Sequence, residues 1–592
     1  MSDRRNRMLR VHRGPPRSHP VALGLVAGVI VGALVTLLVV FLTPGDQGST
    51  TAEGRNEIAS NGNVQGRIYP GDPEDEADLV QDENDRLLDV RSASTARRGT
   101  DSLIPFHLPT GDTSTLILPA RSTPWSLTDL LALAPDTLVL QPGGSYLLSE
   151  NIVVLEGATL DLRAYPGLRI SLVSTPKAFV SIVAIGGTLK IGGNRDTPAK
   201  ISSLDTTTGL RDWTTDDGRA YVRVIGGHAS LSHVDFSHLG FWSGNTGGLA
   251  LTGTDGVEEI DSVTASIDNV TIDSDAFGLF VTRASNVTIR DSEIRNSLVD
   301  GLVFHRFVLD SSVVRTTSTG NAVDGFSLGR SSVDVKYTDI TASDNGRNGL
   351  TLDGQPLADG PSAIGTPIDV YGDNTVTRAK LMDNKRYGIE VSGGRNITVD
   401  SSTFKGNDIG IVLSHGADDV VITGGTFRAQ TRQGIAVRDT VTRARITDAD
   451  ITGGETGVYV RNADATVTGS QITDVSRHGV TLVGDAAGVR VTGNSIAGYG
   501  PAALWTKDAT GGVVEENDLL NWHPAPTVAS VLQSFFQPLT IVWLLLGILL
   551  VATALTRKGG QYGSFRDPYA ERVPLTSLSK GIVSRESIED HK

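Results

Sequence analysis

A glycine followed by a short alternating strand recurs through the middle and later parts of the chain, and this repeat constrains the fold more than any other feature. Successive copies begin 22–24 residues apart, except for one interval of 39 residues. Two or three short strands per unit, each pairing with its counterpart in the next unit, predict a right-handed parallel β-helix. The glycines that begin the copies are Gly278, Gly301, Gly325, Gly349, Gly388, Gly410, Gly434, Gly457 and Gly479.

The composition agrees with an all-β solenoid of this kind. Glycine accounts for 67 of the 592 residues, and only 5% of residues are aromatic. This mixture suits many short strands and tight turns better than long helices. A chain of this length is also too long for one compact core, so an elongated repeat is expected over residues 101–525. The 39-residue interval is interpreted as one coil with an inserted loop, "GQPLADGPSAIGTPIDVYG".

The alternation within each copy assigns its residues to two faces. The first and third residues after each glycine are Leu, Ile, Val or Phe, so they are predicted to fill the coil interior. The second and fourth residues vary and are predicted to point outward. His305 and Asp353 are fourth residues two coils apart, and Arg283, Arg306 and Arg330 are fifth residues of three consecutive coils. Because paired strands lie about 4.8 Å apart, these five side chains are predicted to form one outward patch.

Such a patch suits chemistry on an acidic polysaccharide. Guanidinium groups bind carboxylates in a planar fork, and an imidazole accepts a proton near neutral pH. Removing the C5 proton of a uronic acid develops charge that a cation must neutralise. His305 is the candidate base and Arg330 the candidate neutraliser, while Arg283, Arg306 and Asp353 are candidate substrate-binding residues.

Two reactions share this first step. Return of the proton to the opposite face epimerises the sugar, whereas departure of the C4 substituent cuts the chain as a lyase does. A solvated solenoid face without catalytic function is the structural alternative.

The stretch from Arg219 to Gly354 resembles the periplasmic mannuronan C5-epimerases, which are right-handed parallel β-helix proteins. "VIGGHASLSHVDFSHLGFW" is similar to their Trp-Gly-Gly and Ser-Leu-Gly-Tyr region, "DGLVFHRF" to their Asp-Pro-His-Asp segment, and "DGFSLGR" to the strand that follows. The resemblance implies that His305 is the catalytic base and Arg330 the carboxylate-neutralising arginine, with water returning the proton. Val303 and Arg306 replace the family's two carboxylates, which favours a noncatalytic polysaccharide-binding or export module as the alternative.

Two apolar segments flank the repeat. Residues 21–42 contain no charge, and neither do residues 539–555, the core of a segment that begins near residue 528. Each is long enough to cross a hydrocarbon layer of roughly 30 Å as a helix. Six arginines precede the first segment, and Arg557 and Lys558 follow the second. Both termini are therefore predicted to be cytoplasmic in a two-pass plasma-membrane protein, with the β-helix domain extracytoplasmic.

The remaining segments are expected to lack a core. Residues 1–20 form a basic cytoplasmic tail, residues 43–100 an acidic, flexible linker, and residues 556–592 a disordered cytoplasmic tail. Gly24, Gly28 and Gly32 recur at a spacing that lets helices approach closely, either in a homodimer or against the chain's own second span. Tethering at a membrane makes a polysaccharide synthase a candidate partner.

Several other classes are disfavoured. A formal net charge of −15 argues against nucleic-acid binding, and the absence of cysteine removes thiolate metal sites and cysteine nucleophiles. No cofactor or metal is predicted. Two groups of residues could be considered metal ligands but lack a strong ligand spacing: His228, His233 and His238, and Asp373, Asp383 and Asp408.

Overall fold

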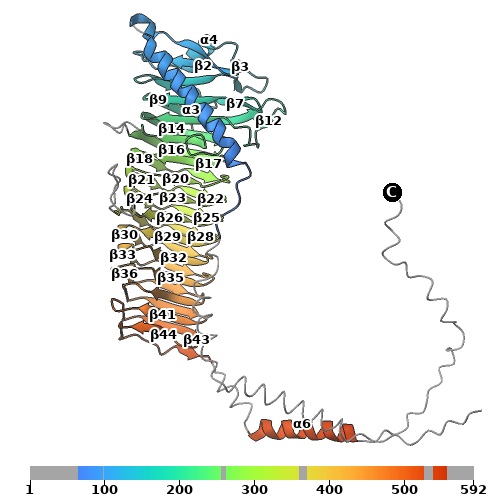
Figure 1. Ribbon diagram of the computed structural model, residues 1–592, viewed down its shortest axis with the longest axis vertical. Helices are drawn as coiled ribbons and strands as arrows, with labels where there is room; N and C mark the ends of the chain where they lie inside the picture. Colours follow the sequence, from blue (N-terminus) through green and yellow to red (C-terminus); the bar gives the residue numbers. More distant parts are fainter. Residues whose placement is uncertain (1–63, 98, 255–261, 359–369, 526–537, 557–592) are drawn as a thin grey trace, which may run out of the picture. The chain divides into compact units, whose positions relative to one another are not determined.

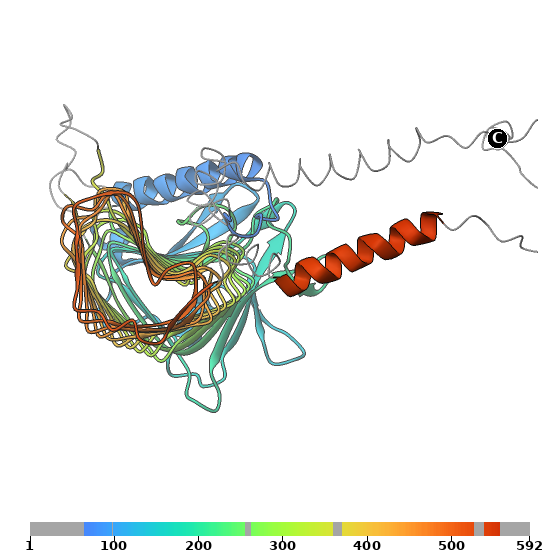
Figure 2. The same ribbon diagram turned by 90° about the horizontal axis from the view of Figure 1, so that it is seen from below.

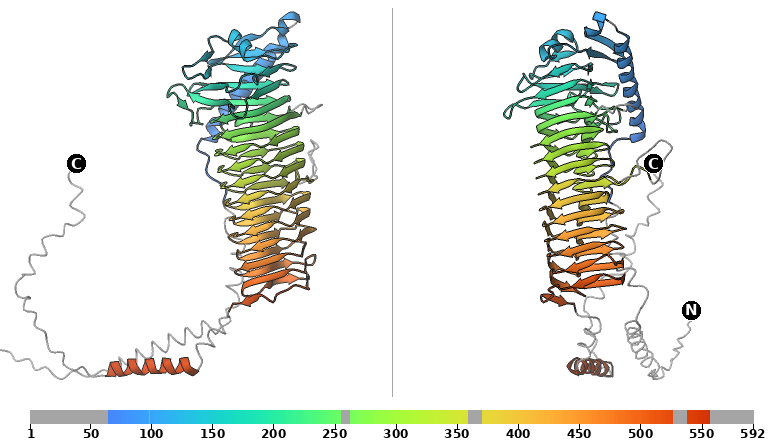
Figure 3. Two further views of the ribbon diagram at one scale, coloured as in Figure 1. Left: turned by 180° about the vertical axis from the view of Figure 1, so that it is seen from behind. Right: turned by 90° about the vertical axis from the view of Figure 1, so that its left-hand side faces the viewer.

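The computed structural model describes residues 64–97, 99–254, 262–358, 370–525 and 538–556. The chain divides into two compact units, one up to Pro524 and one from Ala525 onward. The first unit is a stack of coils whose strands lie side by side along its length (Figure 1; Figure 3). The predicted parallel β-helix is therefore confirmed over the β-strand region.

One sheet, called sheet A, contains the strands that begin near the repeat glycines. Its strands keep a constant parallel register, so that Leu279, Leu302, Phe326 and Leu350 lie in one row. β1 and β2 pair antiparallel at the N-terminal end. Along the solenoid its strands are β1 (Phe106–Thr110), β2 (Thr113–Leu118), β5 (Asn151–Val154), β9 (Ser181–Ile185), β13 (Tyr221–Ile225), β15 (Gly248–Thr252), β17 (Phe277–Thr282), β20 (Leu302–Phe304), β23 (Phe326–Leu328), β26 (Leu350–Gly354), β29 (Tyr387–Gly393), β32 (Ile409–Ser414), β35 (Gln433–Arg438), β38 (Thr456–Arg461), β41 (His478–Asp485) and β44 (Leu504–Thr510).

The second sheet, called sheet B, supplies the other sides of the coils. Its strands pair mostly in parallel between successive coils, with antiparallel hairpins near the N-terminal end. They are β3 (Leu138–Leu140), β4 (Tyr146–Leu148), β6 (Thr159–Asp161), β7 (Arg169–Thr175), β8 (Ala178–Phe179), β10 (Thr188–Gly192), β11 (Ala199–Asp205), β12 (Leu210–Arg211), β14 (His228–Ser237), β16 (Val263–Asp273), β18 (Ala284–Arg290), β19 (Glu293–Arg295), β21 (Val308–Val314), β22 (Thr317–Thr319), β24 (Val333–Thr338), β25 (Thr341–Ser343), β27 (Thr375–Thr377), β28 (Lys380–Met382), β30 (Arg395–Asp400), β31 (Thr403–Lys405), β33 (Asp418–Thr423), β34 (Thr426–Arg428), β36 (Ala444–Thr447), β37 (Asp450–Thr452), β39 (Ala465–Thr468), β40 (Gln471–Val475), β42 (Arg490–Thr492), β43 (Ser495–Gly500), β45 (Val513–Glu515) and β46 (Trp522–Pro524).

The coil interior is filled as the alternation predicts. The first and third residues after each repeat glycine, such as Leu302 and Phe304, are fully buried in one core that extends from Leu116 to Ala503. Burying an aliphatic or aromatic side chain of this size contributes about 1.5–3 kcal/mol. Each coil therefore stabilises its neighbours through a continuous apolar column.

The repeat glycines are required by close contact between coils. A Cβ atom at Gly301 would lie 2.1 Å from the Ser318 hydroxyl oxygen and 2.5 Å from the carbonyl oxygen of Gly325. A Cβ atom at Gly325 would likewise lie 2.8 Å from the carbonyl oxygen of Gly349. A side chain at these positions would push neighbouring coils apart, which explains why each copy of the repeat begins with glycine.

Buried asparagines form a ladder in the turn that precedes sheet A. The Asn321 amide donates to the side-chain oxygen of Asn345 at 2.9 Å, and Asn345 donates to Asn384 at 2.9 Å. Asn384 donates in turn to Asn407 at 3.1 Å. Each of these side chains is at most 2% exposed. The ladder satisfies buried polar groups from one coil to the next and thereby fixes the register of the turns.

A long helix, α3 (Pro73–Ala96), packs on the N-terminal coils (Figure 1). The Asp72 side chain caps its first turn by accepting from the backbone N–H of Glu74 at 2.9 Å. Leu87 and Val90 bury their side chains against the outer face of sheet A. Their partners there include Ile117, Val153, Val183, Tyr221 and Phe241.

A buried polar cluster also attaches α3 to sheet A. Arg86 forms a bidentate ion pair with Glu83 at 2.8 and 2.9 Å and donates to the Ser181 hydroxyl at 2.8 Å. The Tyr221 hydroxyl donates to Glu83 at 2.5 Å. Residues 73–96 belong to the segment 43–100 that the sequence predicts to be a flexible linker, and for this stretch the prediction is wrong. Charged side chains that look solvated in the sequence are partners of one another in the structure.

Three further helices complete the described residues. α4 (Leu127–Leu133) closes the N-terminal end of the core with Leu127 and Leu130, and the short 3-10 helix η1 (Gly99–Leu103) follows α3. α6 (Pro538–Thr556) lies in the second unit and coincides with the second apolar segment. None of the described helices combines the length and apolar character needed to span a membrane. The first apolar segment, 21–42, with Gly24, Gly28 and Gly32, and both terminal tails lie outside the described residues.

Candidate functional site

The register of sheet A brings the predicted site residues to neighbouring coils. The His305 N–H donates to the carbonyl of Val281, and the Gly329 N–H donates to the carbonyl of Phe304. His305 therefore comes directly after β20, and Gly329 has the equivalent position directly after β23. Asp353 has this position on β26. The fourth-residue row thus runs His305, Gly329, Asp353 along three consecutive coils.

His305 is exposed and lies on the outer face of sheet A. Its ring is tilted against the ring of Phe280, with 5.3 Å between the centroids. Desolvation, together with the nearby charges of Arg306 and Arg283, lowers the pKa of His305 below its ordinary value. The imidazole is consequently neutral at pH 7, which is the form that accepts a proton.

The residue between His305 and Asp353 has no side chain. A Cβ atom at Gly329 would lie 2.0 Å from the carbonyl oxygen of His305, so only glycine fits there. Because neighbouring coils are about 4.8 Å apart, the row is without a side chain over roughly two coil spacings. Gly329 is itself half-buried, and 'uncovered position' denotes only this place in the row, between an imidazole and a carboxylate, that carries no side chain.

Arg330 follows that uncovered position and is already engaged with Asp353. Its Nε donates to the Asp353 carboxylate at 3.0 Å, and its terminal nitrogens donate to the Pro356 carbonyl at 3.2 Å and to the Gln355 side chain at 3.3 Å. The Arg330 side chain is 38% exposed. The structure therefore holds the guanidinium beside the row, with two neutral acceptors that a ligand carboxylate would replace.

Arg283 and Arg306 lie on consecutive coils next to His305. The Arg283 N–H donates to the Arg306 carbonyl at 2.8 Å, and the Arg283 guanidinium lies 5.7 Å from the centre of the Phe307 ring. Arg306 is exposed. Both cations influence His305 electrostatically, so the structure places these two arginines near His305.

Four aromatic rings form a track that ends at His305. Tyr69 and Trp242 have ring centroids 5.0 Å apart, Trp242 and Phe277 6.1 Å, and Phe277 and Phe280 6.1 Å. Aromatic pairs favour separations of about 4.5–7 Å. These residues come from three separate parts of the sequence, so no local motif indicated the track. Tyr69, Trp242 and Phe277 are half-buried, whereas Phe280 is only 8% exposed, so the first three rings leave apolar surface that suits the C–H faces of sugar rings.

A buried polar network adjoins the same face and was not predicted. Asp324, which is fully buried, accepts from Arg347 at 2.5 and 2.8 Å and from the Thr351 hydroxyl at 2.7 Å. Its backbone N–H donates to Asp300 at 2.8 Å. Burial and the adjacent Asp324 raise the pKa of Asp300 to about 7. Asp300 is therefore a second group on these coils that exchanges protons near neutral pH.

Not every outward residue of sheet A is solvated. Val303 and Phe280, both second residues after a repeat glycine, are 6% and 8% exposed, and Val412 and Tyr459 further along are fully buried. The coil outline is indented on the side toward α3 (Figure 2). The Thr351 hydroxyl, two residues after Gly349, donates there to Asp324, the residue before Gly325. The prediction that second residues point outward holds, but outward side chains at the indentation are covered.

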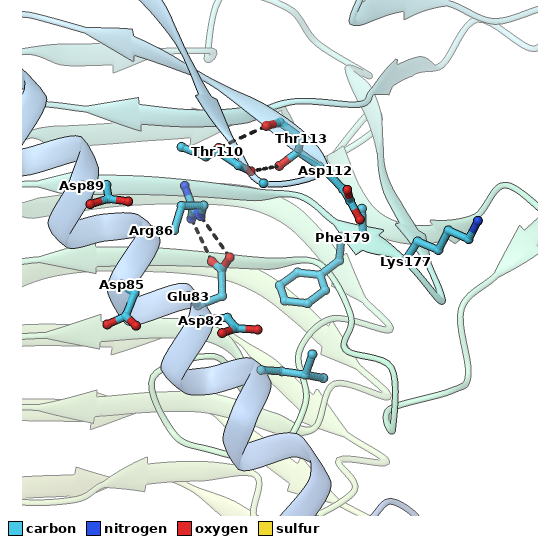
Figure 4. Close-up of a pocket in the computed structure, with 13 residues that line it drawn as sticks. Asp82, Glu83, Asp85, Arg86, Asp89, Thr110, Asp112, Thr113, Lys177 and Phe179 are labelled. Atoms are coloured by element: carbon cyan, nitrogen blue, oxygen red, sulfur yellow. Dashed lines mark hydrogen bonds and ion pairs between the residues drawn. The ribbon is translucent and has the colours of Figure 1, made fainter.

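The cavity beneath α3 is acidic and unsuited to a polyanion. It has a volume of about 460 Å³ and is lined by α3, the β1–β2 turn and the β7–β8 hairpin. Figure 4 shows Asp82, Asp85, Asp89 and Asp112 around it, with Arg86 held by Glu83 and therefore unavailable to a ligand. Lys177 alone adds an uncommitted positive charge among the lining residues shown.

The described residues do not assemble a metal centre. No group of three or more His, Cys, Asp or Glu side chains able to hold a metal ion occurs among them. His228 bonds to Thr264 at 2.8 Å, and His238 packs edge-on against Trp213. Asp408 forms a buried ion pair with Arg432 at 2.6 Å. These residues have structural partners instead of a shared ion.

Comparison with known proteins gives one family match and several similar folds. Residues 345–503 match a family described as periplasmic copper-binding protein (NosD). A variant of the periplasmic alginate epimerase AlgG is 12% identical with a TM-score of 0.47, over 69% of this chain and 85% of that chain. The AlgE6 A-module, a mannuronan C-5 epimerase of Azotobacter vinelandii, is 15% identical with a TM-score of 0.34, over 67% and 96%. No curated protein matches the chain.

The residues of the matched stretch do not fit copper. Between residues 345 and 503 the chain has two histidines, His415 and His478, one methionine and no cysteine. His415 bonds to Ser392 and Ser414, whereas His478 bonds to the Ala502 carbonyl and stacks on Trp505. They lie on different coils without a third soft ligand. The match therefore describes the coil repeat, and the strand pairing shows the chain to be a parallel β-helix protein.

Proposed function

We propose that this protein is an extracytoplasmic β-helix that acts on an acidic polysaccharide by C5-epimerisation of uronosyl residues. The observation that carries the proposal is the row His305–Gly329–Asp353 with Arg330 beside it. This row offers a neutral base, an uncovered position and a guanidinium on adjacent coils, at the end of an aromatic track. A sugar ring seated over Gly329 would meet all of these groups.

The reaction assigns one task to each residue. His305 removes the C5 proton, and the electron pair of the C5–H bond is delocalised into the C6 carboxylate. Arg330 exchanges its neutral acceptors Pro356 and Gln355 for this carboxylate and stabilises the added charge. Water delivers a proton to the opposite face, which inverts C5, and the hydroxide that remains is neutralised through solvent by the proton taken up by His305. Arg283 and Arg306 hold neighbouring carboxylates of the polymer, and Asp353 orients Arg330.

A noncatalytic polysaccharide-binding or export module is the second candidate. Val303 and Arg306 flank His305 where the epimerase motif has carboxylates, and Arg330 already has a carboxylate partner. Such a module would use the aromatic track and the arginines to guide a chain without breaking a C–H bond.

Membrane attachment is part of the proposal and rests on the sequence. The uncharged segments 21–42 and 528–555, with arginines outside both, favour a two-pass plasma-membrane protein with cytoplasmic termini. The apolar side chains of α6, such as Val542, Trp543 and Leu545, are exposed and need a covering environment. A polysaccharide synthase in the same membrane, and a homodimer through Gly24, Gly28 and Gly32, are proposed as partners. Protease accessibility of the two termini in sealed vesicles tests this topology.

The test of the reaction uses the full chain in detergent with polymannuronate, polyguluronate and polygalacturonate in deuterated water. Proton NMR follows deuterium entering at C5, and ultraviolet absorbance follows new double bonds. Deuterium without unsaturation, abolished in His305→Asn and retained in His415→Asn, is the expected result. His415 is an exposed histidine of the same sheet and serves as the matched control.

The other outcomes discriminate between the candidates. Unsaturation that depends on His305 would identify a lyase. Binding without either signal would identify the noncatalytic module.

A further inference from the structure

We propose that a second binding site for an acidic oligosaccharide lies on sheet B, on the N-terminal coils. The site is a cavity of about 420 Å³ on the outer side of β7, β11, β14, β16 and β19, bordered by the β11–β12 hairpin. Hairpins project from the N-terminal coils on the side away from α3 (Figure 2). The class of ligand follows from the proposed function, but the site shares no residue with the row at His305.

The cavity is positively charged in a protein of net charge −15. Four cationic side chains line it, and two of them have carboxylate partners: Lys200 pairs with Asp235 at 3.0 Å and Arg295 with Asp273 at 3.1 Å. The other two, Arg169 and Arg211, are exposed and have no ion pair among the described residues. Two uncommitted guanidinium groups facing one cavity favour a ligand with more than one carboxylate.

Hydroxyl groups line the cavity in a regular row. Ser171, Ser202 and Ser237 are register partners on β7, β11 and β14, and the row continues to Asp273 and Arg295. Five strands spaced by about 4.8 Å give the row a length of roughly 19 Å. This length and the repeated hydroxyls fit an extended, hydroxyl-rich chain instead of a single small anion.

An exposed tryptophan stands beside the cavity. Trp213, two residues after Arg211, is 67% exposed, and its ring meets His238 edge-on at 4.2 Å between centroids. His238 follows Ser237 and is 3% exposed, and neither of its ring nitrogens has a hydrogen-bond partner. Burial, with help from nearby Arg211 and Arg219, lowers the pKa of His238 to about 4. The neutral ring supports the indole, which leaves the indole face open for the C–H face of a sugar.

These features together select an acidic saccharide over inorganic phosphate. A phosphate would use the guanidinium groups alone, whereas an oligouronate would use the two arginines, the serine row and the indole at once. A polymer long enough to reach both faces would be held on sheet B while another part of it lies along sheet A. The site would thus retain the polymer between catalytic events.

The experiment measures binding of fluorescently labelled hexamers to the full chain in detergent by fluorescence anisotropy. The probes are hexamannuronate and hexagalacturonate, with labelled maltohexaose as the uncharged control and inorganic phosphate as competitor. The test variants are the double substitution Arg169→Gln/Arg211→Gln and, separately, Trp213→Ala. The matched control is Arg428→Gln/Arg490→Gln, which removes two exposed arginines from later coils of the same sheet.

We expect the Arg169/Arg211 variant to weaken hexauronate binding at least tenfold, and Trp213→Ala to weaken it severalfold. The Arg428/Arg490 control should retain this binding, and so should Arg283→Gln/Arg306→Gln, which removes the proposed carboxylate-binding arginines of sheet A and thereby separates the two sites. Equal binding by the Arg169/Arg211 variant and its control would overturn the proposal, as would binding that phosphate displaces fully at equimolar concentration. If His305→Asn loses C5 exchange but still binds the hexamers, the site on sheet B is supported. This conclusion does not depend on whether the proposed reaction is correct.

Discussion

At the scale of single residues, the outer face of sheet A carries two groups whose protonation is set by their surroundings. His305 is kept neutral by desolvation and by the cations Arg306 and Arg283, whereas Asp300 retains its proton to higher pH because it is buried next to Asp324. The first effect prepares a base, and the second removes a negative charge from a face proposed to bind a polyanion. Both arise from neighbours on adjacent coils.

Arg306→Gln tests the electrostatic control of His305. Removing this cation is expected to raise the pKa of His305, since Arg306 opposes protonation of the ring. NMR titration of ring-labelled histidine, with the His305 signal assigned from His305→Asn, measures the change. Arg428→Gln, on a distant coil, should leave the signal where it is. A His305 pKa unaffected by loss of Arg306 would contradict the account.

Asp300→Asn tests the linkage between Asp300 and stability. The folded-state pKa of Asp300 is raised to about 7, whereas an unfolded aspartate titrates near 3.9. The stability that the protonated form contributes is therefore fully present below about pH 4 and is lost as the pH rises toward 7. Wild type should lose about 3–4 kcal/mol more than Asp300→Asn across this range. Denaturant melts at several pH values measure the free energy of unfolding of both proteins. The same pH dependence in the two proteins would contradict the assigned pKa of Asp300.

At the scale of elements, the asparagine ladder couples each turn to the next. Asn384→Ala would remove the side-chain acceptor of the Asn345 backbone N–H and of one Asn345 amide proton, and one of two donors to the Asn407 oxygen, all in buried positions. We expect a loss of about 2–4 kcal/mol in the free energy of unfolding. Denaturant melts measure the loss, with Asn286→Gly as the control. Asn286 is exposed with a φ of 54°, so glycine there should be nearly neutral.

The coils could be predicted from the sequence, whereas α3 could not. Each coil is encoded locally, because the repeat glycine and the alternation that follows it lie within five consecutive residues, as from Gly301 to Phe304. The helix is fixed by partners about a hundred residues away, such as Tyr221 and Ser181 for the Glu83–Arg86 pair. A charged stretch of this kind predicts a solvated linker, because its distant partners cannot be recognised from the sequence.

At the scale of the whole molecule, the solenoid is expected to unfold piecewise. Each coil contacts mainly its neighbours, so a defect should weaken its own region most. Leu160→Ala in the N-terminal coils and Leu482→Ala in the C-terminal coils remove comparable buried side chains, each at a cost of about 2–5 kcal/mol. Hydrogen exchange followed by mass spectrometry should show faster exchange near the substituted coil in each variant. Uniform acceleration along the chain in both variants would contradict this.

The candidate site was predictable in part for the same reason. A constant register makes neighbours of residues 24 positions apart, so His305 and Arg330 could be placed on adjacent coils from spacing alone. The Arg330–Asp353 ion pair follows the same rule. The aromatic track depends on how loops fold back over the coils. The same is true of the β11–β12 hairpin with Arg211 and of Trp213, which follows it. No periodicity in the sequence encodes that.

The position of α3 in the chain also imposes an order on synthesis. The helix emerges before every strand that it covers, and its last partner, Phe241, follows Val90 by about 150 residues. At roughly 5–20 residues per second, Leu87 and Val90 wait on the order of ten seconds or more for a surface to pack on. During that interval the nascent chain needs a chaperone or the translocation machinery to shield this segment. A stalled chain ending before residue 221 should accordingly be a better chaperone client than one ending after residue 252.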